Sequence, residues 1–190
     1  MKLIKRILAG RVTKFIVLFC TLFGILYGLN YVIIVLTIPG GLYCRWIATH
    51  LDYVSLYRAT LLKGASFFVN ALGFKNHVDK YTLRIPGISV VRIVYSCLGF
   101  NLLCCWVAFT LSYPQHFKRK LQYTFSGIVI ITVLNMIRIG GLGMIRSITY
   151  LKSAAIDHHL IFNIITYGII FLMVRKMLQN GKPSFNNKLK

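Results

Sequence analysis

Apolar stretches separated by clusters of Lys and Arg constrain this chain more than any other feature of its sequence. Four of them cover about residues 12–38, 98–113, 121–145 and 159–174, and 57% of the 190 residues are hydrophobic. A helix of about 20 apolar residues crosses the ~30 Å hydrocarbon core of a bilayer, where the backbone has to satisfy its hydrogen bonds internally. The sequence therefore predicts an all-α fold, a polytopic transmembrane helical bundle of about four spans.

The segment between the first two stretches predicts structure that does not cross the bilayer. Residues 53–74 have a helical pattern that Arg58 and Lys63 interrupt, which favours an interfacial or re-entrant amphipathic helix over a full span. Residues 76–94 alternate apolar and polar side chains around Pro86-Gly87, which is typical of a short hairpin on the membrane surface.

The chain is expected to form one domain. We expect residues 1–177 to be a single integral membrane domain and residues 178–190 to be a polar, disordered cytoplasmic tail. The N-terminal apolar run is longer than the core of a usual signal peptide and lacks a small-x-small cleavage site. We therefore interpret it as an uncleaved anchor.

The charge balance predicts the orientation and excludes one class of partner. The chain has 23 Lys and Arg but only three acids. A nucleic-acid-binding protein would not place its cations between apolar spans, so we expect them to fix the topology and to contact anionic lipids. Thirteen of them lie in residues 1–14, residues 114–120 and residues 175–190. Four spans place all three segments, and both termini, in the cytoplasm.

Three chemically distinct side chains are predicted to share one depth in the membrane. Cys97 lies 17 residues before Pro114, Arg138 lies 17 residues after Leu121, and His159 lies 16 residues before the basic exit of the last span. At ~1.5 Å per residue, each is about 24–26 Å from the inner face, close to the outer surface. Each residue alone also fits a structural role, but an arginine within a span by default marks a functional site or a buried partner.

A thiol, a guanidinium and an imidazole in one layer indicate thiol acyl transfer. A nearby cation and the N-terminal dipole of the helix that Cys97 is expected to open would both favour the thiolate. The imidazole can move a proton, and Arg138 can stabilise the negative charge on a carbonyl oxygen. No carboxylate is placed to orient the imidazole, since Asp157 is too close in sequence to His159 to face it. The five cysteines lack zinc-site spacing, so we expect no metal and no cofactor.

At these residues the sequence resembles the exosortase/archaeosortase family of membrane-embedded cysteine transpeptidases. The matching region covers residues 83–175 and contains three pieces: SCLGF with Cys97 and Gly99, NMIRI with Asn135 and Arg138, and DHHLIFN with His158 and His159. The family often has Cys-Ser-Gly where this chain has Cys97-Leu98-Gly99, and the chain is short for the family, which indicates a minimal subtype.

The resemblance implies a role for each of these residues. Cys97 would be the nucleophile, Arg138 would stabilise the oxyanion, and a histidine would act as the base. Asn163 matches the small residue that the family has four positions after the histidine, which favours His159, although His158 stays a candidate. We expect Asn135 and Gly99 to position the substrate.

The resemblance also implies a substrate class and a location. Such enzymes cleave C-terminal sorting signals, each a short motif, an apolar helix and a basic tail, from exported proteins. The expected partners are therefore exported proteins and membrane lipids, with no nucleic acid. The expected location is the inner membrane of a bacterial or archaeal cell, with the active site facing outward. The alternative is a non-enzymatic assembly subunit or a small carrier of a secretion or exopolysaccharide system, although a carrier would more typically show repeats with broken helices.

Overall fold

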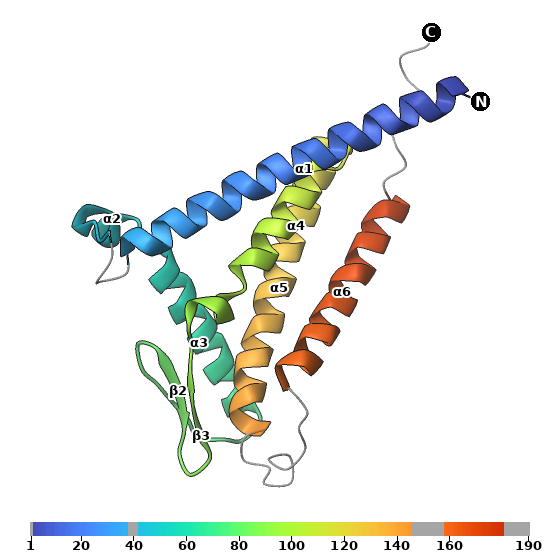
Figure 1. Cartoon of the computed structure of the whole chain (residues 1–190). Coiled ribbons are helices and arrows are strands. Elements are labelled where there is room, and N and C mark those ends of the chain that lie inside the picture. The colour runs from blue at the N-terminus through green and yellow to red at the C-terminus, as the bar shows by residue number, and fades with distance from the viewer. Residues whose placement is uncertain (1, 38–41, 146–157, 181–190) are drawn as a thin grey trace.

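The computed structural model describes residues 2–37, 42–145 and 158–180, and it is mainly helical (Figure 1). Its helices are α1 (Lys2–Thr37), α2 (Arg45–His50), α3 (Tyr53–Ala71), α4 (Phe100–Ser112), α5 (Phe117–Ile145) and α6 (His158–Asn180). Helix α5 packs against α3, α4 and α6, and α1 crosses α4 obliquely (Figure 1).

Two helices in the described part of the chain are long and apolar enough to cross a membrane. They are Val12–Thr37 of α1 and Phe117–Met144 of α5. Helix α4 is apolar but has 13 residues, about 20 Å at ~1.5 Å per residue, which is shorter than the ~30 Å hydrocarbon core. The structure therefore supports two of the roughly four expected spans, and the full count stays a prediction.

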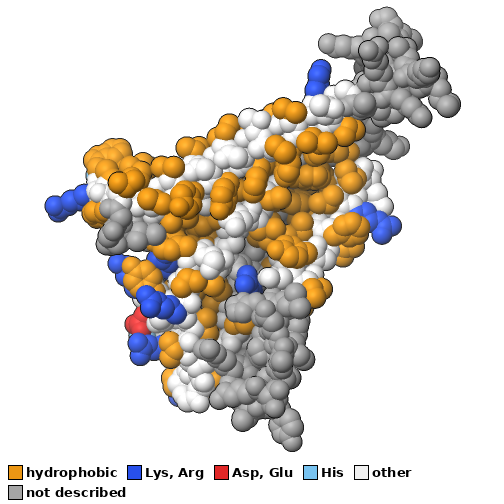
Figure 2. Space-filling view, in the orientation of Figure 1, with side chains coloured by type: hydrophobic (Ala, Val, Ile, Leu, Met, Phe, Trp, Pro, Cys, Tyr) orange, Lys and Arg blue, Asp and Glu red, His pale blue; other side chains and the backbone are white. Residues whose placement is uncertain are grey.

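The surface of α1 suits lipid better than water. Val17 and Leu29 are each 59% exposed, and hydrophobic side chains cover much of this helix in the space-filling view (Figure 2). Soluble monomers rarely expose apolar patches of this extent, so a membrane explains the pattern.

The surface hairpin predicted for residues 76–94 is confirmed as a hairpin and extended by one strand. Strands β1 (His77–Val78), β2 (Thr82–Ile85) and β3 (Ser89–Arg92) form an antiparallel sheet in the order β1-β2-β3. Gly87 has a φ of 74° in the tight turn between β2 and β3, a conformation that glycine adopts without steric cost. The sheet packs on the helices: Leu83 and Ile85 are buried, and the Ser89 hydroxyl donates to the carbonyl oxygen of Gly143 at 2.6 Å.

Helix α3 packs against α5, and the interfacial or re-entrant position in the membrane expected for residues 53–74 stays a prediction. Its apolar face supplies much of the main core, with buried side chains at Val54, Leu61, Leu62, Ala65 and Val69. Small residues allow this close contact with α5, because a Cβ at Gly64 would overlap the Met136 side chain and one at Gly140 would meet Phe68 at 3.0 Å. The amphipathic pattern was correct, but its apolar face contacts protein.

Candidate functional site

A short turn before α4 carries Cys97. Residues Tyr95–Leu98 form a 3-10 helix, and Gly99 follows with φ 74° and ψ 18°, the left-handed conformation, before α4 begins at Phe100. Cys97 therefore precedes α4 and lies outside its first turn. This corrects the expectation that Cys97 opens the helix, on which the expected effect of the helix dipole depended.

The Asn135 side chain links this turn to α5 by hydrogen bonds. Its side-chain amide nitrogen donates to the carbonyl oxygens of both Cys97 and Leu98, each at 3.0 Å. A primary amide has two N–H donors, so both are used here. Gly99 makes the approach possible, because a Cβ at this position would lie 3.3 Å from the same nitrogen. The amide of Asn135, expected to position the substrate, thus holds the backbone of the Cys97 turn.

A cavity of about 260 Å³ lies beside this turn, between the start of α4, the middle of α5 and the first turns of α6. Gly99 and Ser96 line it from the turn, Asn135 and Arg138 from α5, and Asn163 from α6. Among the described residues that line it, Arg138 is the one cation and none is acidic. Phe100 and Ile131 supply apolar wall, which lowers the local polarity and strengthens electrostatic interactions.

The structure brings together three of the six residues that the sequence singled out, namely Gly99, Asn135 and Arg138. The Cys97 side chain is half-buried and packs against the hydrophobic core, and it does not line the cavity, although Ser96 and Gly99 on either side do. Helix α6 begins at His158, but the side chains of His158 and His159 lie outside the described residues.

Arg58 is a buried charge beside the site that the sequence analysis treated only as an interruption. Its side chain is 3% exposed, and its guanidinium carbon lies 4.8 Å from the ring centroid of Tyr81 and 4.9 Å from that of Tyr95. Among the described residues, its Nε atom has no hydrogen-bond partner. Since Tyr95 lines the cavity, Arg58 connects α3 to the wall of the site. Helical periodicity indicates the burial of Arg58, because this residue lies four positions after buried Val54 on the apolar face of α3.

The acidic residues of the described part of the chain are used elsewhere. Asp52 caps α3 by accepting from the backbone N–H of Ser55 at 2.9 Å. Asp79 forms an ion pair with Arg84 in the sheet, with 3.0 Å between the Oδ2 and Nε atoms. The third acid, Asp157, lies outside the described residues. Among the described residues, no group of three or more His, Cys, Asp or Glu side chains could hold a metal ion.

Comparison with known proteins yields one family. The family model for transmembrane exosortases matches residues 4–175, which include the Cys97 turn, the middle of α5 and the start of α6. No curated protein and no solved structure matches the chain significantly.

Proposed function

The chain belongs to the transmembrane exosortase family, and from this premise we propose that it is a membrane cysteine transpeptidase that cleaves the C-terminal sorting signals of exported proteins. The observation that carries the proposal is the pair of hydrogen bonds from Asn135 to the Cys97 turn. Arg138 follows Asn135 by three residues, so the two share a helix face. One turn of α5 therefore holds the backbone around Cys97 through Asn135 and also carries Arg138.

The proposed reaction is acyl transfer through a thioester. The Cys97 sulfur attacks the scissile carbonyl carbon while its proton passes to His159 (or to His158), and Arg138 stabilises the negative charge on the oxygen. The carbon–nitrogen bond then breaks, and the imidazolium returns the proton to the leaving amine. Water or an amine next attacks the thioester and regenerates the thiol. The proposal requires the thiol to face the cavity when substrate is bound.

The proposed orientation places the cavity near the outer membrane surface. Arg138 lies about 19 residues after Arg119 on the continuous helix α5, which is about 28 Å at ~1.5 Å per residue. The cavity and the basic cluster at residues 118–120 are thus separated by about one membrane thickness. Single cysteines introduced into a variant without native cysteines test this in intact cells: a cysteine at Asn76 should react with an impermeant maleimide from outside, and one at Arg119 should not. Labelling of Asn76 only after lysis would contradict the orientation.

A processing assay separates the enzyme from the competing assembly-subunit function. A tagged exported protein with a C-terminal sorting tail is expressed with each variant, and its size is followed. Cys97→Ala should abolish the size shift, whereas Cys104→Ala should keep it, because Cys104 lies within α4 and outside the turn that Asn135 holds. Full processing by Cys97→Ala would end the enzyme proposal and favour a non-enzymatic subunit.

A further inference from the structure

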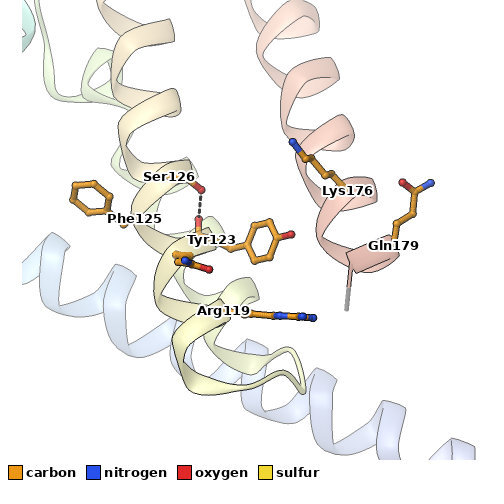
Figure 3. A pocket seen from close by; sticks show the side chains of 7 residues that line it. Arg119, Tyr123, Phe125, Ser126, Lys176 and Gln179 are labelled. Carbon is orange, nitrogen blue, oxygen red and sulfur yellow. Dashed lines mark hydrogen bonds between the residues drawn. The ribbon is translucent and has the colours of Figure 1, made fainter. Parts of the chain in front are cut away.

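Tyr95 lines the same cavity as Arg138 and precedes Cys97 by two residues, at the start of the 3-10 turn. A larger cavity of about 870 Å³ between the start of α5 and the end of α6 shares no lining residue with it. In that larger cavity, Arg119 and Tyr123 project from α5 toward α6 (Figure 3). The Cys97 turn contributes to the smaller cavity, so a substrate that reaches this turn from the cavity lies beside the Tyr95 ring.

The position of the Tyr95 ring depends on Arg58 of α3. The guanidinium carbon of Arg58 lies 4.9 Å from the centroid of the Tyr95 ring and 4.8 Å from that of the Tyr81 ring. Tyr81 is itself linked to the end of the sheet, because its carbonyl oxygen accepts from the N–H of Ile93 at 2.9 Å. A planar guanidinium stacks flat on aromatic faces. Arg58 therefore joins α3, the residue before β2 and the wall of the cavity.

Burying a charge at this position of α3 costs stability. Arg58 is 3% exposed on a helix face whose other buried members include Val54, Leu61 and Leu62. Removing a cation from water costs free energy, and replacing buried charged groups with apolar side chains of similar volume is often neutral or stabilising. A role in the site therefore explains this arginine better than a role in packing alone.

We propose that Tyr95 contacts the substrate side chain next to the scissile bond, and that Arg58 is the positioning residue that fixes the Tyr95 ring for this contact. The inference rests on the proposed transpeptidase function. Phe100 and Ile131 line the same cavity, so the substrate side chain that packs against Tyr95 is apolar. The stacked guanidinium restricts rotation of the ring out of the cavity wall, which a lysine or methionine in place of Arg58 cannot do.

Processing kinetics of the full chain in detergent test the inference, with the purified tagged protein that carries a sorting tail as the substrate. Arg58→Met should lower kcat/KM about tenfold, the effect of one misplaced aromatic contact. Its thermal unfolding temperature should equal or exceed that of the unaltered protein, because a buried charge is removed. Tyr95→Leu should show the same loss of kcat/KM, and Tyr95→Phe should keep the native value because the ring remains.

Two further variants separate the proposed role from a folding defect. The matched control is Leu62→Met, an apolar exchange one turn further along α3 at a buried position that does not line the cavity. It should leave kcat/KM unchanged, because a swap that conserves volume is well tolerated. Arg58→Lys keeps the charge but loses the flat stacking, so it should show the same tenfold loss as Arg58→Met when it is measured below its unfolding transition.

The double variant tests whether Arg58 acts through Tyr95. If it does, Arg58→Met combined with Tyr95→Leu should be no slower than Tyr95→Leu alone. A multiplied loss of about a hundredfold would show that the two residues act independently, and it would overturn the inference. A native kcat/KM in Arg58→Met would overturn it as well. Failure of the proposed function gives a different result, because the unaltered protein would then leave the substrate uncleaved.

Discussion

Replacing Asn135 with aspartate should release the Cys97 turn from α5 with almost no change in side-chain shape. The amide donates to the carbonyl oxygens of Cys97 and Leu98 at 3.0 Å each, and Asn135 is 7% exposed. An ionised carboxylate can only accept hydrogen bonds, so two carbonyl oxygens would face a negative charge. The carboxylate oxygen that replaces the donating nitrogen would repel the turn.

The magnitude follows from the two bonds. A net intramolecular hydrogen bond contributes about 1 kcal/mol, so their loss alone costs about 2 kcal/mol. Since 1.4 kcal/mol is a factor of ten, the ratio of held to released turn should fall about 30-fold, before any repulsion is counted. We expect the rate of sorting-tail processing by Asn135→Asp to fall by up to about that factor.

Two measurements distinguish this role from direct substrate contact. The first is the processing rate, and the second is the rate at which a maleimide alkylates Cys97 without substrate, in a background that lacks the other four cysteines. A released turn should change the alkylation rate, which a lost substrate contact would leave unaltered. Thr132→Val is the matched control, because it removes the contact between the Thr132 and Tyr57 hydroxyls at 3.3 Å, about one turn earlier on α5. Normal processing by Asn135→Asp, or slow processing with unchanged alkylation, would refute the reasoning.

Three further variants test other parts of the site. Arg138→Lys should stay folded but slow processing by about 10²–10³, because a lysine cannot reproduce a planar pair of donors to an oxyanion; processing at the native rate would remove Arg138 from the mechanism. Gly99→Ala should lower the unfolding free energy by about 1–2 kcal/mol, the cost of a left-handed residue with a Cβ, and an unchanged unfolding temperature in detergent would contradict the φ of 74°. Arg58→Lys should lower the free energy of unfolding by about 2 kcal/mol, because a lysine cannot stack flat on Tyr81 and Tyr95. Its control is Lys63→Arg, at an exposed position of the same helix, which should leave the free energy of unfolding unchanged. Equal stability of the two variants would show that the stacking has no role.

The fold was predictable from sequence where one local rule decides the outcome. The turn at Pro86-Gly87 and the alternation around it predicted the hairpin, and the apolar runs predicted α1 and α5. The role of α3 was not predictable, because an amphipathic pattern shows that one face is apolar but not whether lipid or another helix covers it. The length of α4 depended on a left-handed residue at Gly99, which starts the helix later than its apolar run begins.

The candidate site was predictable to the extent that it depends on helical rise. Counting along continuous α5 placed Arg138 far from the basic end, and the structure places it in one cavity with Gly99 and Asn163. The contact of Asn135 with the Cys97 turn could not be predicted, since it depends on how two helices pack. The catalytic roles of Cys97, His158 and His159 stay predictions.

The most direct test of the central claim is the detection of an acyl-enzyme on Cys97. The purified chain is incubated with a peptide that carries a sorting motif, quenched in acid, digested and examined by mass spectrometry. The account predicts a thioester adduct on the peptide that contains Cys97, removed by hydroxylamine and absent from Cys97→Ala. Release of the cleaved product by Cys97→Ala, or an adduct on Cys44, Cys104 or Cys105 in its place, would contradict the account.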